Sequence, residues 1–309
     1  MHTRTIKSLK SDKLNRISGS ANLILSTLFA LLALICVVPL ILVVTISISS
    51  ERSLYEFGYR FIPKELSLEA YRFLWNNRAM LLQSMKVTLI VTVGGTILGL
   101  FLTTSMGYVL SRKEYKLRNF FTWIVFIPMI FNGGLISTYF INKTVLNLGD
   151  SLWALILPLL VSSFNVVICK TFFMTTVPDS VVESAKIDGA SQIRIYFRIV
   201  LPISLPLLAT IALFLIFGYW NDWWQALLYI GEPNLKPLQS LLMSIERNIE
   251  YIAKYSALLG GSQTELLSQL PRESFRMAIA VAIILPVSLA YPFFQRYFIS
   301  GLTVGAVKG

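Results

Sequence analysis

The chain alternates between long uncharged apolar runs and short charged segments. The first run extends from Leu23 to Ile48 without a single charged side chain. Five more follow, at about 87–109, 120–141, 152–169, 203–230 and 277–294. At about 1.5 Å of helical rise per residue, runs of this length cross a hydrocarbon core of about 30 Å. The pattern predicts an all-α integral membrane protein with six transmembrane helices.

Composition agrees with a membrane location. The chain has 309 residues, of which 55% are hydrophobic and 14% are charged. Soluble domains carry about 25% charged residues. The net charge of +11 does not require a nucleic-acid partner, because Lys and Arg beside membrane spans give the same excess. We therefore expect contact with membrane lipid and none with nucleic acid.

The distribution of Lys and Arg predicts the orientation. They cluster in the N-terminal tail, residues 1–20, and in "SRKEYKLR", residues 111–118. By the positive-inside rule, both segments and residues 170–202 are cytoplasmic, while 49–86, 142–151 and 231–276 face outward. The C-terminal tail, residues 299–309, then returns to the cytoplasm. The first run is longer than the apolar part of a cleaved signal peptide, which is about 7–15 residues, so we interpret it as a span.

Residues for most enzyme chemistries are missing. The single histidine, His2, lies in the polar tail, and Cys36 and Cys169 occur singly within apolar runs. This argues against histidine-based triads, zinc sites and disulfide frameworks. No GxxxxGK[ST] sequence is present. The apolar runs hold almost no acids, which argues against an ion-coupled carrier. We expect no catalytic residue, metal or cofactor on this chain.

The polar segment "PDSVVESAKIDGASQIRIYFRIVLP", residues 178–202, has the pattern of two short helices. Ser180 and Glu183 have the spacing of a capping box, and Gly189 stands where a left-handed helix stop would fall. The pattern predicts one helix over about 180–188. A second is predicted over about 191–200, with Ile193, Phe197 and Val200 on one stripe. Such a pair either anchors the loop to lipid headgroups or docks a cytoplasmic partner.

The spacing within this segment resembles the "EAA" signature of ABC-importer membrane subunits. That signature reads E-A-A, three residues, G, nine residues, I, one residue, L-P. Here it is formed by Glu183, Ser184, Ala185, Gly189, Ile199, Leu201 and Pro202. Ser184 is the one departure, and serine is also small. From about residue 20 onward, the chain resembles the MalG-like permeases of the carbohydrate-uptake class, and within them the LplC/YtcP branch.

This resemblance implies a type I importer fold and a set of partners. Residues 179–200 would be coupling helices that seat in a nucleotide-binding ATPase dimer, which would bind the ATP and Mg. The resemblance also implies a second, MalF-like permease subunit, an extracytoplasmic solute-binding protein and a bacterial cell membrane. The implied docking residues also include Asp188 and Arg194. Within the outer loop, a helix over 238–258 and a break at Gly260–Gly261 form the candidate contact with the binding protein.

One acid, Asp222, falls within the fifth apolar run, in "GYWNDWWQAL". An acid within a span is a candidate for the substrate pathway, together with Trp220 and Asn221. The alternative is a structural carboxylate beside an aromatic belt at the membrane interface. The resemblance implies that the transported solute is a saccharide, and an oligosaccharide in particular. An importer of another solute, or an ion-coupled carrier, remains an alternative that uptake measurements would separate.

Overall fold

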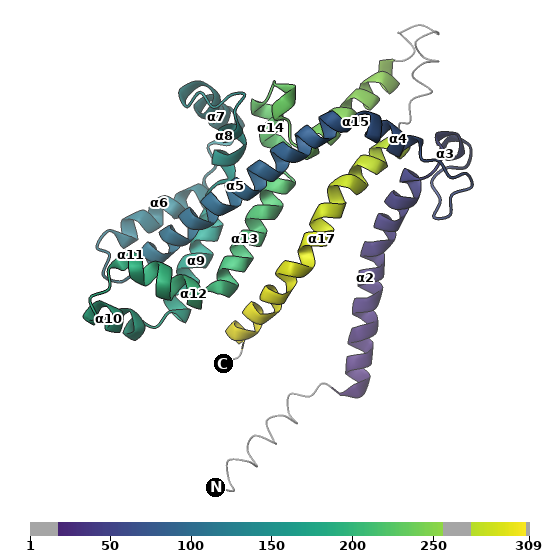
Figure 1. Cartoon of the computed structure of the whole chain (residues 1–309). Coiled ribbons are helices and arrows are strands. Elements are labelled where there is room, and N and C mark those ends of the chain that lie inside the picture. Colours follow the sequence, from purple (N-terminus) through teal and green to yellow (C-terminus); the bar gives the residue numbers. More distant parts are fainter. Residues whose placement is uncertain (1–17, 256–272, 307–309) are drawn as a thin grey trace. The chain divides into compact units, whose positions relative to one another are not determined.

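The computed structural model describes residues 18–255 and 273–306. Within these ranges the regular secondary structure is helical, apart from an isolated antiparallel bridge between Ser49 and Leu66 (Figure 1). It divides into two compact units, one of residues up to 71 with 271–281 and one of 72–270 with 282–309. The prediction of an all-α fold is confirmed for the described residues. The expected N-terminal tail lies almost entirely outside them, as does the Gly260–Gly261 break.

The first unit begins with α2 (Gly19–Ser47), which matches the first predicted span. The Ser18 side chain caps it by accepting from the Ala21 amide at 3.3 Å. After α3 (Glu51–Phe57), the unit also receives the start of α17 (Glu273–Ala306). The Glu51 carboxylate joins these two helices, because it accepts from both the amide and the hydroxyl of Ser274 at 2.8 Å.

The second unit is organised by α5 (Arg78–Ser111), which packs against α9 (Ser163–Thr176) and α13 (Leu205–Trp220). Glycines on α5 allow this close packing. A Cβ on Gly95 would lie 2.4 Å from the Tyr219 ring, and a Cβ on Gly99 would lie 2.8 Å from the Leu160 carbonyl oxygen. The sequence "VGGTILG" therefore marks a helix contact at these two positions. Gly94 is different, because no atom lies within 4 Å of its Cβ position.

Two predicted spans, at about 120–141 and 152–169, are wrong as single helices, because each is broken. The bends are 119° between Arg118–Ile130 and Gly134–Val145, and 49° between Leu152–Leu159 and Ser163–Thr176. A third bend, of 85° between Gln192–Ile203 and Leu205–Trp220, lies at the start of the fifth predicted span. Two helices, α2 and α5, are long and apolar enough to cross a membrane, or up to five spans if each bent pair counts as one. This count covers the described residues only. The sixth predicted run lies within α17.

The remaining elements are α15 (Leu238–Tyr255) and several shorter helices and turns, of which α4 (Glu69–Asn76) begins in the first unit and ends in the second. The fifth predicted span ends early, since α13 stops at Trp220 and a separate helix, α14 (Trp224–Tyr229), follows. The helix predicted over 238–258 is α15 (Leu238–Tyr255) within the described range. The others are α4 (Glu69–Asn76), α6 (Arg118–Ile130), α7 (Gly134–Phe140), α8 (Leu152–Ile156), α10 (Asp179–Ile187), α11 (Gln192–Ile195) and α12 (Leu201–Ile203), with π-helical turns at Ile141–Val145 and Tyr196–Val200 and 3-10 turns at Leu157–Leu159 and Pro233–Leu235.

Candidate functional site

The predicted left-handed stop at Gly189 is confirmed. Helix α10 ends at Ile187, and Gly189 has a φ of +78°. The Ala190 amide donates to the Ala185 carbonyl at 2.9 Å, and the Gly189 amide donates to the Lys186 carbonyl at 3.0 Å. This pair of bonds is a Schellman motif, which satisfies the last carbonyls of the helix and reverses the chain. The reversal turns α10 and α11 into a hairpin, which we call the docking hairpin, residues 179–203.

The capping box predicted from Ser180 and Glu183 is wrong. The residue in the N-cap position is Pro178, and no side chain caps α10. The helix therefore starts at Asp179, one residue before the expected position. A capped start is found instead in the second helix, where the Ser191 side chain accepts from the Arg194 amide at 3.3 Å.

The apolar stripe predicted for the second helix is correct for Val200 and wrong for Ile193 and Phe197. The buried residues are Ile195, Tyr196 and Val200, whereas Ile193 and Phe197 are 72% and 49% exposed. The physical reason is the direction in which Tyr196 packs. Its hydroxyl reaches α5, so the neighbouring faces of the helix rotate away from the core. A π-helical turn over Tyr196–Val200 accompanies this change in which side chains face the core.

Tyr196 connects the docking hairpin to α5. Its hydroxyl lies 2.7 Å from the Thr104 hydroxyl and accepts from the Ser105 hydroxyl at 3.2 Å. Its ring lies 5.3 Å from the ring of Tyr108, which in turn makes an edge contact with Phe173 of α9. The hairpin is thus held against the helices by a buried polar contact inside an aromatic cluster.

Ion pairs join α10 to the basic loop 112–117. Asp179 accepts from Lys113 at 3.1 Å and from Arg112 at 3.5 Å, and Lys186 pairs with Glu114. The hydrogen bond and charge of Lys113 hold the pKa of Asp179 below its ordinary value. These exposed pairs contribute little stability individually. Together with buried Val182, which lies between Asp179 and Lys186 on the same face, they fix which face of α10 is turned inward.

The implied docking residues fall into two groups. Glu183, Ser184, Asp188, Gly189, Arg194 and Pro202 are exposed. Ala185 is buried in the core, and Ile199 and Leu201 pack against it. The second group therefore supports the hairpin from inside. Sequence reasoning missed the exposed side chain of Ile187, at 86% exposure, and gave Ile193, at 72%, a place on the apolar stripe but no docking role. Their apolar character next to polar residues was the available signal.

The pathway candidates lie at the end of α13, and each makes an internal contact. The Asp222 carboxylate accepts from the Gln225 amide at 3.3 Å, and the Asn221 side-chain amide donates to the Phe217 carbonyl at 3.0 Å. Trp220 is buried, and its indole N–H donates to the Ile283 carbonyl of α17 at 3.3 Å. These bonds give all three residues a structural role. They do not test a role in the pathway.

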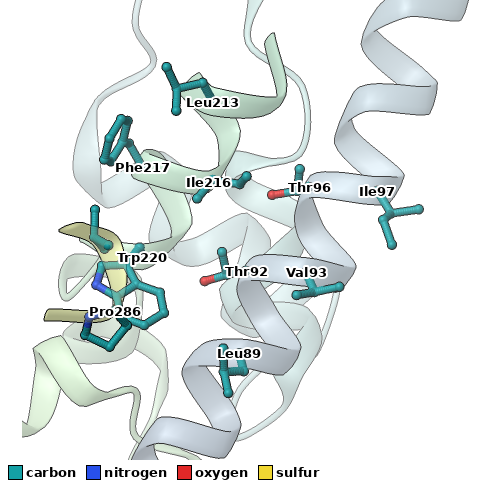
Figure 2. A pocket seen from close by; sticks show the side chains of 11 residues that line it. Leu89, Thr92, Val93, Thr96, Ile97, Leu213, Ile216, Phe217, Trp220 and Pro286 are labelled. Atoms are coloured by element: carbon teal, nitrogen blue, oxygen red, sulfur yellow. The ribbon is translucent and has the colours of Figure 1, made fainter. Parts of the chain in front are cut away.

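Trp220 also forms a wall of a pocket of about 320 Å³ between α5, α13 and α17. Figure 2 shows Phe217, Trp220 and Pro286 on one side and the hydroxyls of Thr92 and Thr96 directed toward the space. Within the described part of the chain, neither hydroxyl has a hydrogen-bond partner. The walls are otherwise apolar, so a saccharide here would leave most of its hydroxyl groups without protein partners.

Comparison with known proteins identifies the class to which these features belong. A family model described as "Binding-protein-dependent transport system inner membrane component" matches residues 95–304. Protein LplC of Bacillus subtilis (strain 168) is 38% identical over 89% of this chain and 90% of its own length. The chain belongs to this family of transport-system membrane components. It is accordingly a permease subunit of an ABC importer.

Two further relatives agree with this assignment. The polygalacturonan/rhamnogalacturonan transport system permease protein YtcP of Bacillus subtilis (strain 168) is 39% identical over 90% of this chain and 94% of its own length. The resemblance to the LplC/YtcP branch is thus confirmed. Among solved structures, a bacterial ABC transporter involved in the import of the acidic polysaccharide alginate matches with a TM-score of 0.77 and 26% identity. That match covers 92% of this chain and 99% of the other. The permease fold is confirmed.

Proposed function

We propose that this permease subunit forms half of the translocation pathway for an oligosaccharide or polysaccharide fragment. The observation that carries the proposal is likeness over nearly the whole chain to YtcP, whose name specifies polygalacturonan and rhamnogalacturonan transport. The arabinooligosaccharides permease AraQ of Bacillus subtilis (strain 168), 29% identical, and the alginate importer support the same class of substrate. The solute would be delivered by an extracytoplasmic binding protein.

The docking hairpin is the part proposed to contact an ATPase subunit. Ile187 and Ile193 are the most exposed apolar residues of the hairpin, and they are accompanied by the charged residues Glu183, Asp188 and Arg194. A small apolar centre with a polar rim is a common composition for a protein interface. The inward face is already occupied by Val182 and Ala185 and by the ion pairs of α10. ATP and Mg would be bound and ATP hydrolysed by the partner subunits.

The proposed topology is six spans in a bacterial cell membrane, with both ends in the cytoplasm. The basic loop beside the docking hairpin supports this orientation, since loops rich in Lys and Arg stay on the cytoplasmic side. A second, MalF-like permease subunit would complete the pathway. The outer loop, residues 231–276, would meet the binding protein.

The proposed mechanism is a rigid-body switch between inward-facing and outward-facing states. Closure of the ATPase dimer would displace the docking hairpin. The Tyr196–Thr104 contact and the buried side chains Ile195 and Val200 would transmit this displacement to α5. Because α5 packs closely on α13 at Gly95 and Gly99, the two helices would move together.

The docking role is tested by co-expression of the tagged chain with the subunits encoded beside it. Ile193→Asp places a charge at the centre of the proposed interface without disturbing the core. The matched control is Ile62→Asp, because Ile62 is also strongly exposed, at 82%, and lies in a segment expected outside. We expect the ATPase to be lost with Ile193→Asp and retained with Ile62→Asp. Retention with both variants would contradict docking through this surface.

The substrate class is tested by uptake into proteoliposomes that contain the complete complex and its binding protein. The candidate solutes are oligogalacturonides, arabinooligosaccharides and alginate oligomers, with a peptide and a polyol as alternatives. We expect ATP-dependent accumulation of at least one saccharide and of neither alternative. Uptake of the peptide or the polyol, with no uptake of any saccharide, would show that the substrate is not a saccharide. Uptake that is independent of ATP would contradict coupling to an ATPase.

A further inference from the structure

An open apolar groove of about 360 Å³ lies between α5 and α6. Its walls include Met106 and Val109 from α5 and Phe121 and Ile124 from α6. Its floor is closed by Leu110 and Val125, which are buried against Val166 of α9. Val109, Phe121 and Ile124 are each about two-fifths exposed or more, at 43%, 38% and 46%. The groove is therefore open along its length to whatever surrounds the helices.

One end of the groove is formed by Tyr115 in the basic loop 112–117. The Tyr115 ring stacks on Phe121 with their centroids 6.1 Å apart, and its carbonyl accepts from the Arg118 amide at 3.0 Å. Lys116 follows Tyr115 directly in the sequence, and Arg118 lies three positions after it. The other charges of the loop are paired, because Arg112 and Lys113 contact Asp179 and Glu114 contacts Lys186. In residues 18–255 and 273–306, Lys116 and Arg118 make no ion pair.

Two further features make this end of the groove favourable for an anion. Lys170 of α9 donates to the Thr122 hydroxyl at 3.1 Å, and Arg118 acts on it as a neighbouring like charge. Arg118 is also the first residue of α6, whose N-cap residue, Leu117, offers no side chain to the free amides. The positive end of a helix dipole and nearby cations repel each other, and an anion would relieve both.

We propose that this groove binds an anionic phospholipid, with its phosphate near Lys116 and Arg118 and one acyl chain along the groove. The apolar walls distinguish this ligand from a free phosphate ion. On α6, Phe120, Trp123 and Ile127 are also at least half exposed, so the groove continues into an apolar surface that suits lipid. The inference rests on the membrane orientation given above, in which the basic loop lies at the cytoplasmic interface.

Lipid at this position would act on the docking hairpin through the loop they share. Arg112 and Lys113 come directly before Glu114 and Tyr115, and they hold Asp179 at the start of α10. A bound phosphate would fix the loop from its other side. We therefore expect the ATPase activity of the complex to depend on anionic lipid.

The test uses the detergent-purified complex and native mass spectrometry with phosphatidylglycerol and phosphatidylcholine of identical acyl chains. Arg118→Gln and Lys116→Gln are each expected to weaken phosphatidylglycerol binding about fivefold, and together roughly 30-fold, from about 1 kcal/mol per cation. Val109→Phe fills the groove without changing charge and should weaken both lipids. The control, Arg78→Gln, removes a charge at the opposite end of α5 and should change neither.

Three outcomes would overturn the proposal. These are equal binding of the two lipids by the wild type, unchanged binding in the Lys116/Arg118 double variant, and full displacement of phosphatidylglycerol by inorganic phosphate, which would indicate a free-anion site. The same samples report whether the ATPase co-purifies. A complex that keeps the ATPase but shows no preference for phosphatidylglycerol contradicts the lipid site alone. A chain that prefers phosphatidylglycerol but lacks the ATPase contradicts the docking proposal alone.

Discussion

The hydroxyl of Tyr196 lies 2.7 Å from the hydroxyl of Thr104, and this buried contact joins the docking hairpin to α5. Thr104 also donates to the Leu100 carbonyl at 2.6 Å, so the Tyr196 hydroxyl is the donor between the two side chains. The contact lies within the EAA motif, whose fixed positions are partly exposed and partly packed against the core. It links the hairpin directly to α5, which packs on α9 and α13.

Tyr196→Phe should weaken this link while preserving the ring packing. A buried hydrogen bond contributes about 0.5–1.5 kcal/mol to the free energy of unfolding, so the chain should fold and retain the ATPase. We expect ATP hydrolysis to continue and ATP-driven uptake to fall, because the hairpin would move with less displacement of α5. The measurement is the ratio of uptake to hydrolysis in proteoliposomes. A double-mutant cycle with Thr104→Val isolates the pair, and fully additive effects would contradict a direct coupling.

Substitutions at Gly189 should separate backbone conformation from steric space. No atom lies within 4 Å of the Cβ position, so a small side chain meets no obstacle there. The φ of +78° is nevertheless unfavourable for alanine by about 1–2 kcal/mol, whereas asparagine tolerates this region better. We expect ATPase co-purification to decrease in the order Gly, Asn, Ala. Equal recovery with all three residues would show that the left-handed stop is not required.

The sequence predicted the docking hairpin where the signal was local. The stop at Gly189 depends on one residue type and on backbone hydrogen bonds that span no more than five residues. A short stretch of sequence is therefore enough to predict it. The start of α10 was predicted wrongly because the spacing of Ser180 and Glu183 is only one of several influences on where the helix begins. Pro178 occupies the N-cap position, and Asp179 pairs with Arg112 and Lys113, which are far away in sequence.

Hydropathy located the apolar segments and could not locate their breaks. The chain around Phe131 is apolar on both sides of the bend, so the hydropathy averaged over a window does not change at the bend. The left-handed Gly134, with a φ of +82°, and the bond from its amide to the Asn132 side chain define that turn. The prediction of the buried stripe on the second hairpin helix was partly wrong for a related reason. Tyr196 is held by a contact with Thr104, and the two residues are 92 positions apart in the sequence.

The packing of α5 on α13 should be sensitive to one glycine and insensitive to its neighbour. Gly95→Ala places a methyl group 2.4 Å from the Tyr219 ring, which is held by a bond from its hydroxyl to the Ile156 carbonyl at 2.9 Å. Overpacking of this kind costs about 1–3 kcal/mol. Gly94→Ala meets no atom within 4 Å and should be neutral or stabilising, because alanine favours helix. Melting temperatures in detergent compare the two, and equal values would contradict tight packing at Gly95.

The contact of Asp150 with Gly231 and Glu232 joins two loops, and it should become less stable as the pH falls. Its carboxylate accepts from the amides of Gly231 at 2.6 Å and Glu232 at 2.9 Å, and its own amide donates to the Tyr229 carbonyl at 3.0 Å. The two amide bonds, from Glu232 and then Gly231, lower the pKa of Asp150 below its ordinary value. The folded state therefore binds this proton more weakly than the unfolded state does. Its contribution is complete above the ordinary pKa of about 4 and disappears as the pH falls through the folded-state pKa.

Asp150→Asn should therefore lower the melting temperature at pH 7, and the difference from wild type should shrink as the pH falls below about 4. The substitution keeps an oxygen that accepts from the Gly231 and Glu232 amides, and it removes the negative charge that strengthens those bonds. It also keeps a residue type that tolerates the φ of +52° at this position, so backbone strain is matched between the two proteins. The measurement is a series of melting curves in detergent from pH 7 to pH 3. A difference that stays constant over the series would mean that the Asp150 charge does not hold these two loops together.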